Sequence, residues 1–137
     1  MAASLSIILY KGSPIDASKY RHTVLFVEFP DNTTLLLHVI GASGFFEAEV
    51  KRGEDPFKSQ KFVKQIPVGT IQGQGKVAIE SEIKSTPIDN SDPSWNCQSW
   101  IGDALKKLSD SGWITSDARS NAIDAMAEVL VDAPDEF

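Results

Sequence analysis

The only cysteine of the chain, Cys97, lies in a segment with the signals of a helix start, residues 92–101. Asp92 and Ser94 each carry a side-chain oxygen that can cap a helix, and Pro93 suits a first helical position, which needs no N–H donor. Cys97 then falls in the first turn, where aligned peptide dipoles concentrate partial positive charge. Because positive charge favours the nucleophilic thiolate, the segment predicts a reactive cysteine.

The same residue also fits a packing role. One face of the predicted helix is apolar at the spacing i, i+4, i+7, i+8, i+11. It comprises Cys97, Ile101, Ala104, Leu105 and Leu108. A cysteine on such a face acts as a small hydrophobe, and a third role, a redox-sensing thiol, is compatible with the same pattern.

Composition bounds the class of protein. A chain of 137 residues predicts a single domain, residues 1–137, with a hydrophobic core that needs no metal or disulfide. One cysteine excludes an internal disulfide and a cysteine-rich zinc site, and two histidines would leave carboxylates as the main ligands of any metal. We therefore expect no metal and no cofactor.

The net charge and the N-terminal residues limit the classes of partner and the cellular compartment that the sequence predicts. A net charge of −6 argues against nucleic-acid binding, which depends on clustered Lys and Arg. Residues 1–10 lack a basic leader, and their apolar run is too short for a signal peptide or a membrane span. The sequence predicts a cytoplasmic protein without a membrane partner and no particular oligomeric state.

The strongest secondary-structure signal is a β-hairpin, with arms at 22–29 and 34–40 and a Pro-Asp-Asn turn between them. Both arms are apolar at nearly every position, which predicts that the sheet is covered on both faces or that these strands are central. Further strands are predicted at 4–10 and 45–50, the latter with Glu47 and Glu49 facing solvent. An edge strand is predicted at 61–69, where Pro67 cannot donate to a ladder.

Three helices complete the predicted fold. The apolar residues in 76–84 fit both the two-residue period of a strand and the period of a helix, and we interpret the segment as a short helix. The cysteine helix ends near residue 109, and a last helix over 117–131 starts at a Thr115 or Ser116 cap. Its inward positions are Ala118, Ala122, Ile123, Met126, Val129 and Leu130. The fold class is α+β, with an antiparallel sheet packed against the helix that carries the cysteine.

Two short motifs carry a family resemblance. Residues 21–24 read Arg-His-Thr-Val at the start of a strand, and residues 95–100 read Trp-Asn-Cys-Gln-Ser-Trp at the start of a helix. In this order they resemble the circularly permuted papain-like cysteine enzymes, namely the PPPDE (deSUMOylating isopeptidase) and lecithin:retinol acyltransferase groups. The resemblance covers about residues 5–110, and the last helix has no counterpart in it.

The resemblance implies a role for each motif residue. Cys97 would be the nucleophile, His22 the base, and His38 a second histidine that orients the first. A hairpin loop with an odd number of residues would put both histidines on one face of the sheet. The ordinary alternative for each is a hydrogen-bonded strand histidine without a catalytic role.

The oxyanion site is less defined by sequence. The backbone N–H of Cys97 at the helix start is the natural first donor. The candidate second donors are Gln98, Asn96 and Tyr20. Asn96 can equally cap the helix. Trp95 and Trp100 flank the cysteine and either wall a substrate groove or pack in the core.

These features imply a cysteine-dependent hydrolase or acyl transferase with a permuted papain-like (NlpC-like) architecture. Its substrate would be a peptide, an isopeptide or a small-molecule amide or acyl compound, attacked to form a thioester at Cys97. The alternative is a non-catalytic binding module of the same fold.

Overall fold

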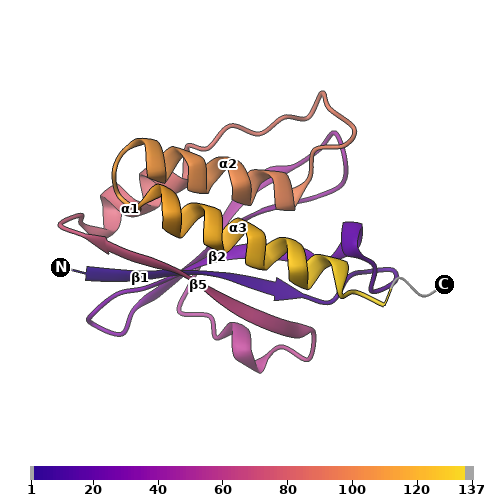
Figure 1. Cartoon of the computed structure of the whole chain (residues 1–137), viewed down its shortest axis with the longest axis horizontal. Helices are drawn as coiled ribbons and strands as arrows, with labels where there is room; N and C mark the ends of the chain where they lie inside the picture. The colour runs from indigo at the N-terminus through magenta and orange to yellow at the C-terminus, as the bar shows by residue number, and fades with distance from the viewer. Residues whose placement is uncertain (1, 135–137) are drawn as a thin grey trace.

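The computed structural model describes residues 2–134, which form a five-stranded antiparallel sheet and three α-helices (Figure 1). The strands are β1 (Ala2–Tyr10), β2 (His22–Glu28), β3 (Thr34–Ile40), β4 (Glu47–Arg52) and β5 (Phe62–Gln72). The helices are α1 (Lys76–Lys84), α2 (Cys97–Asp110) and α3 (Ser116–Val131), and two 3-10 turns are η1 (Ser18–Tyr20) and η2 (Pro56–Lys58). The α+β class and the packing of helices on an antiparallel sheet are therefore as predicted.

The strand order is β4-β3-β2-β1-β5, so the predicted hairpin lies inside the sheet and β5 lies at an edge. Glu28 pairs with Thr34, which leaves a loop of residues 29–33 between β2 and β3. Asn32 adopts a φ of 69° in this loop, a conformation that asparagine tolerates better than most residues. The prediction of an edge strand containing Pro67 is confirmed.

Both faces of the hairpin are covered, as its continuous apolar pattern predicts. One face packs against the helices in a cluster that joins Leu25 and Leu37 to Ile101 and Leu105 of α2. The opposite face buries a smaller cluster of Ile8, Val24, Phe26 and Leu36. Phe57 of η2 stacks edge-on against Phe26, with ring centroids 6.0 Å apart.

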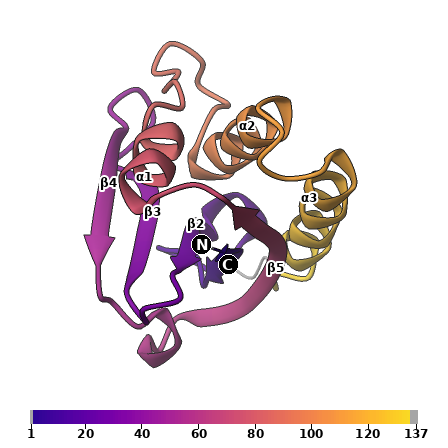
Figure 2. The same ribbon diagram turned by 90° about the vertical axis from the view of Figure 1, so that its left-hand side faces the viewer.

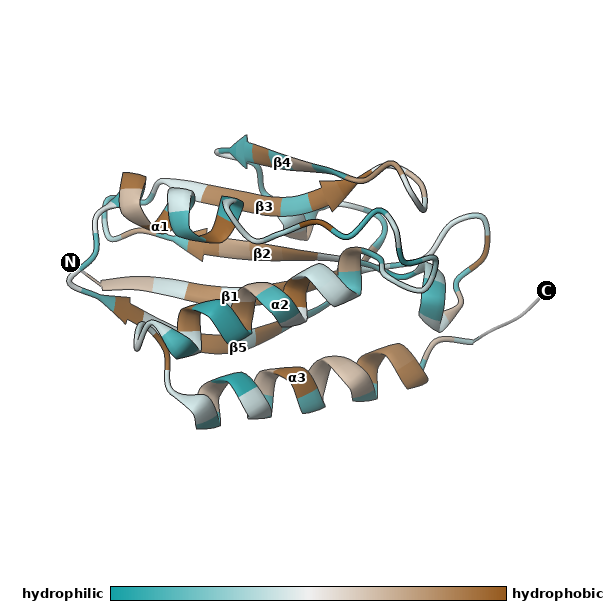
Figure 3. Cartoon of the chain, turned by 90° about the horizontal axis from the view of Figure 1, so that it is seen from above, coloured by the Kyte–Doolittle hydropathy of each residue, from teal (hydrophilic) through white to brown (hydrophobic). Residues whose placement is uncertain are grey.

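The sheet is strongly curved, and β5 sweeps from the η2 side towards α3 (Figure 2). The interior strands β2 and β3 are mostly hydrophobic along their length (Figure 3). Of the inward positions predicted on α3, Ala122 and Met126 are buried, and Ile123, Val129 and Leu130 pack partly buried against the core. Across residues 2–134, no helix combines the length and apolarity of a membrane span.

Candidate active site

Helix α2 begins at Cys97, and its cap is Asn96. The Asn96 side-chain oxygen accepts from the backbone N–H of Gln98 at 3.0 Å and of Ser99 at 3.2 Å, while Ser99 Oγ accepts from the Asn96 N–H at 3.2 Å. This reciprocal capping box fixes Cys97 as the first helical residue. Of the cap residues that the sequence offers, Asn96 is therefore confirmed. Asp92 and Ser94 do not cap the helix, because Asp92 Oδ1 accepts from the N–H and hydroxyl of Ser94 in a separate turn.

The Cys97 side chain is half-buried, and its sulfur lies 3.9 Å from the backbone carbonyl oxygen of Arg21. In this arrangement the thiol donates to Arg21 O. Over the described part of the chain, the backbone N–H of Cys97 has no acceptor, because the Asn96 side chain is used by the next two N–H groups. That N–H is the donor expected of an oxyanion site at a helix start.

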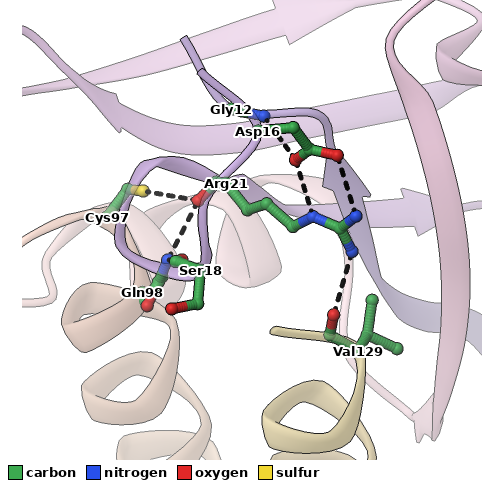
Figure 4. A network of polar contacts seen from close by, with 7 residues as sticks. All are labelled: Gly12, Asp16, Ser18, Arg21, Cys97, Gln98 and Val129. Atoms are coloured by element: carbon green, nitrogen blue, oxygen red, sulfur yellow. Dashed lines mark hydrogen bonds and ion pairs between the residues drawn. The ribbon is translucent and has the colours of Figure 1, made fainter. Parts of the chain in front are cut away.

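Gln98 ties the helix start to the beginning of β2. Its amide nitrogen donates to the carbonyl oxygens of Ser18 at 2.7 Å and Arg21 at 3.0 Å (Figure 4). Both amide hydrogens are thereby engaged in holding η1 and Arg21 against α2. Of the three candidate second donors, Asn96 serves as the cap and Gln98 as this tie, whereas the Tyr20 side chain is 40 % exposed and borders the pocket beside Cys97.

The Arg21 side chain is held by an ion pair and a further hydrogen bond. Its guanidinium binds both carboxylate oxygens of Asp16, at 2.9 and 3.0 Å, and donates to the carbonyl oxygen of Val129 in α3 at 2.9 Å (Figure 4). The hydrogen bonds from Arg21 lower the pKa of Asp16 to about 2. The residue before His22 is thus held by α2, α3 and the 11–17 loop together.

The two histidines lie on one face of the sheet and are in direct contact. The β2–β3 loop has an odd number of residues, and His22 Nε2 lies 2.7 Å from His38 Nδ1. His38 Nε2 lies in turn 2.7 Å from Oε1 of Glu49, its direct partner in the β3–β4 register. Three neighbouring strands therefore supply a continuous chain from His22 through His38 to Glu49.

Glu49 is a candidate site residue that the sequence pattern alone does not identify. The alternation of Glu47 and Glu49 predicts that both face solvent, and the Glu49 side chain is indeed about one-third exposed, at 35 %. The same alternation puts a carboxylate on the face of β4 that is shared with the histidines. Only the β3–β4 register, which pairs Glu49 with His38, turns this pattern into a contact.

Burial and charge determine the protonation of His22 and Glu49. Burial lowers the pKa of His22 to about 4; the neighbouring His38 and Lys51 side chains lower it further, and Glu49 opposes the shift. The hydrogen bond from His38 holds the pKa of Glu49 below its usual range. At neutral pH, His22 is therefore an uncharged imidazole and Glu49 a carboxylate.

The low pKa of His22 makes the stability of the protein depend on pH. Between the ordinary histidine value of 6.5 and about 4, the unfolded chain binds a proton at this position that the folded chain does not. Stability is thus full above pH 6.5 and falls as pH drops towards 4. We expect urea unfolding to show a loss of roughly 2 kcal/mol between about pH 7 and about pH 5, largely absent in His22→Gln. An equal loss in both proteins would contradict this origin.

Cys97 and His22 border the same pocket, whose volume is about 760 Å³. Alternation along β2 places the His22 side chain with Val24, on the sheet face away from α2, and its ring stacks on Tyr10 with centroids 6.1 Å apart. His22 also borders a second pocket of about 420 Å³ on that face, beside His38. Within residues 2–134 no hydrogen bond joins the thiol to the His22 ring, so the catalytic contact stays a prediction.

The two tryptophans beside the cysteine have different positions. Trp95 borders the pocket, stacks edge-on against Phe46 with centroids 5.6 Å apart, and donates to Asp103 at 3.1 Å. Trp100 is 1 % exposed and donates to the Thr86 carbonyl oxygen at 3.3 Å. Both tryptophans therefore pack in the core, and Trp95, which is 8 % exposed, also borders the pocket.

The His, Cys, Asp and Glu side chains of residues 2–134 include no group of three that could hold a metal ion. Comparison with curated proteins and with solved structures gave no match. A family model matches residues 9–115, a range that contains His22, His38, Glu49 and Cys97 and ends before α3. The chain belongs to this family, DUF6540, a family of unknown function.

Proposed function

We propose that the chain is a cysteine-dependent hydrolase or acyl transferase of the permuted papain-like class. One observation carries the proposal. Cys97, with an unused N–H at the start of α2, borders the same pocket as a histidine that is neutral and hydrogen-bonded to a second histidine. A nucleophile, an oxyanion donor and a base are the parts that acyl transfer requires.

The reaction requires the Cys97 sulfur to leave the Arg21 carbonyl. It also requires the His22 ring to turn from the face that it shares with Val24, so that sulfur and ring meet in the pocket that both residues border. The sulfur attacks the acyl carbon while the His22 ring takes the thiol proton, and the Cys97 N–H stabilises the oxyanion. The bond to the leaving amine or alcohol breaks, and His22 gives that group its proton. A thioester remains on Cys97.

Water or an amine then attacks the thioester and gives a proton to His22. The carbon–sulfur bond breaks, the acid or amide is released, and the sulfur recovers the proton from His22. The pocket, at about 760 Å³, has the size of a small-ligand site. Peptides, isopeptides and small amides are the proposed substrates.

An activated ester tests this proposal without knowledge of the natural substrate. We expect p-nitrophenyl acetate to release a burst of p-nitrophenolate equivalent to the enzyme, together with one acetyl group on Cys97 detected by mass spectrometry of the intact protein and its peptides. Free cysteine at the same thiol concentration is the control for intrinsic reactivity. Acetylation of lysines without acetyl-Cys97 would count against the proposal.

A non-catalytic binding module is the second candidate, and the hydrogen bond from the thiol to Arg21 O favours it, because that bond is made by the neutral thiol. Alkylation by iodoacetamide at about pH 6 separates the two. A catalytic Cys97 should label faster than free cysteine, since His22 is already neutral at that pH and can take the proton. A slow or inert thiol would favour the binding module.

A further inference from the structure

The contacts between Glu49, His38 and His22 restrict where their protons can be. Each of the two contacts is 2.7 Å long, so each contains one shared hydrogen. Glu49 is a carboxylate and can only accept. The hydrogen of the outer contact must therefore sit on His38 Nε2.

The position of that proton determines the next one. In the state in which both rings are neutral, His38 has a single N–H, so its Nδ1 is left as an acceptor. The hydrogen of the inner contact must then sit on His22 Nε2. His22 Nδ1 keeps its lone pair and, among the described residues, has no hydrogen-bond partner.

Without the Glu49 carboxylate, the hydrogen bond between the two histidines could run in the opposite direction equally well. Two neutral histidines in contact can also bond with His38 Nδ1 donating to His22 Nε2, which has the same number of hydrogen bonds. With the hydrogen bond in that direction, His22 Nδ1 carries the proton and has no lone pair to offer a thiol. The carboxylate of Glu49 is the group that makes the two directions unequal.

We infer that Glu49 is a positioning residue that sets the tautomers of both histidines, so that Nδ1 of His22 is the nitrogen that takes the proton of Cys97. The catalytic half of this inference rests on the proposed function, whereas the tautomers do not. Lys51, with its ammonium 3.8 Å from the same Glu49 oxygen, is the nearest other charge and is an exposed cation that cannot replace the acceptor.

Nitrogen-15 NMR of the histidine rings tests the inference directly, because the chain contains only two histidines. At about pH 8, above the usual titration range of histidine, both rings of the wild type should be in the Nε2–H form. Glu49→Gln offers His38 both a donor and an acceptor, so both rings should become mixtures that include the Nδ1–H form. The matched control is Glu47→Gln, an exposed residue of the same strand, which should leave both spectra unchanged.

An Nδ1–H form of His22 in the wild type, or unchanged tautomers in Glu49→Gln, would overturn the inference. Repeating the spectra with Cys97→Ala keeps this test independent of the thiol, so it holds even if the acylation experiment fails. In the acylation assay, Glu49→Gln should lower the rate about tenfold with little change in KM, and Glu47→Gln should match the wild type. A rate unaffected by Glu49→Gln, in a wild type that does acylate, would remove its catalytic role.

Discussion

Replacing Cys97 with alanine is expected to abolish the p-nitrophenolate burst and the acetylated enzyme while leaving the protein folded. The chain has no other cysteine that could take over the nucleophilic step. The N–H at the helix start and the His22–His38 pair would both remain, yet neither can form a thioester. Stopped-flow absorbance and intact mass measure the loss, and circular dichroism with urea unfolding measures the fold.

The cost of this change to stability should be small. Cys97 is half-buried at the N-terminus of α2, so removing one sulfur atom should lower the free energy of unfolding by about 1 kcal/mol. Ile101→Val, one turn further along α2 at a fully buried position, is the matched control with a similar expected cost. It should keep the burst. If Cys97→Ala instead unfolds the protein and the wild type shows no burst, Cys97 is a packing residue.

The hairpin that carries both histidines is predictable because local chemistry determines it. Its arms are β-forming and apolar throughout, and a Pro-Asp-Asn turn joins them. The odd length of the loop then decides that His22 and His38 share a face. The helix that carries Cys97 follows in the same way from its apolar spacing.

The contact between His38 and Glu49 depends instead on how β4 aligns with β3. That alignment is set by the 41–46 loop, in which Gly41 has a φ of 110° and the Phe46 N–H donates to Asn90 in a segment far along the chain. A shift of one residue would turn Glu49 to the other face of β4. No periodic pattern in the sequence specifies this register.

The choice among the candidate caps of α2 and the role of Gln98 could not be predicted from the sequence either. Asp92, Ser94 and Asn96 all carry capping oxygens, and only the reciprocal bond from the Asn96 N–H to Ser99 Oγ distinguishes Asn96. Gln98 resembles an oxyanion donor in sequence, but its amide bonds to the carbonyls of Ser18 and Arg21, about eighty positions away. Roles set by contacts between distant segments follow from the folded structure and not from spacing.

Replacing His22 with alanine is expected to slow acylation by about 10²- to 10⁴-fold, the usual contribution of a general base. The thiol would lose its proton acceptor, and the leaving group its proton donor. His38→Ala should be milder, because the base remains and only the hydrogen bond that orients its ring is lost. If Cys97 and His22 act as a simple dyad, His38→Ala should change stability alone.

The pH dependence of Cys97 alkylation shows directly whether the His22 ring acts on the thiol. In the wild type, assistance by His22 requires its neutral form, so labelling should persist at mildly acidic pH and fall only as pH drops through about 4. In His22→Ala, only the dipole of α2 remains to favour the thiolate, and labelling should move to higher pH. Identical profiles for the two proteins would mean that the ring does not act on Cys97, and the catalytic assignment of both residues would then be withdrawn in favour of the packing interpretation.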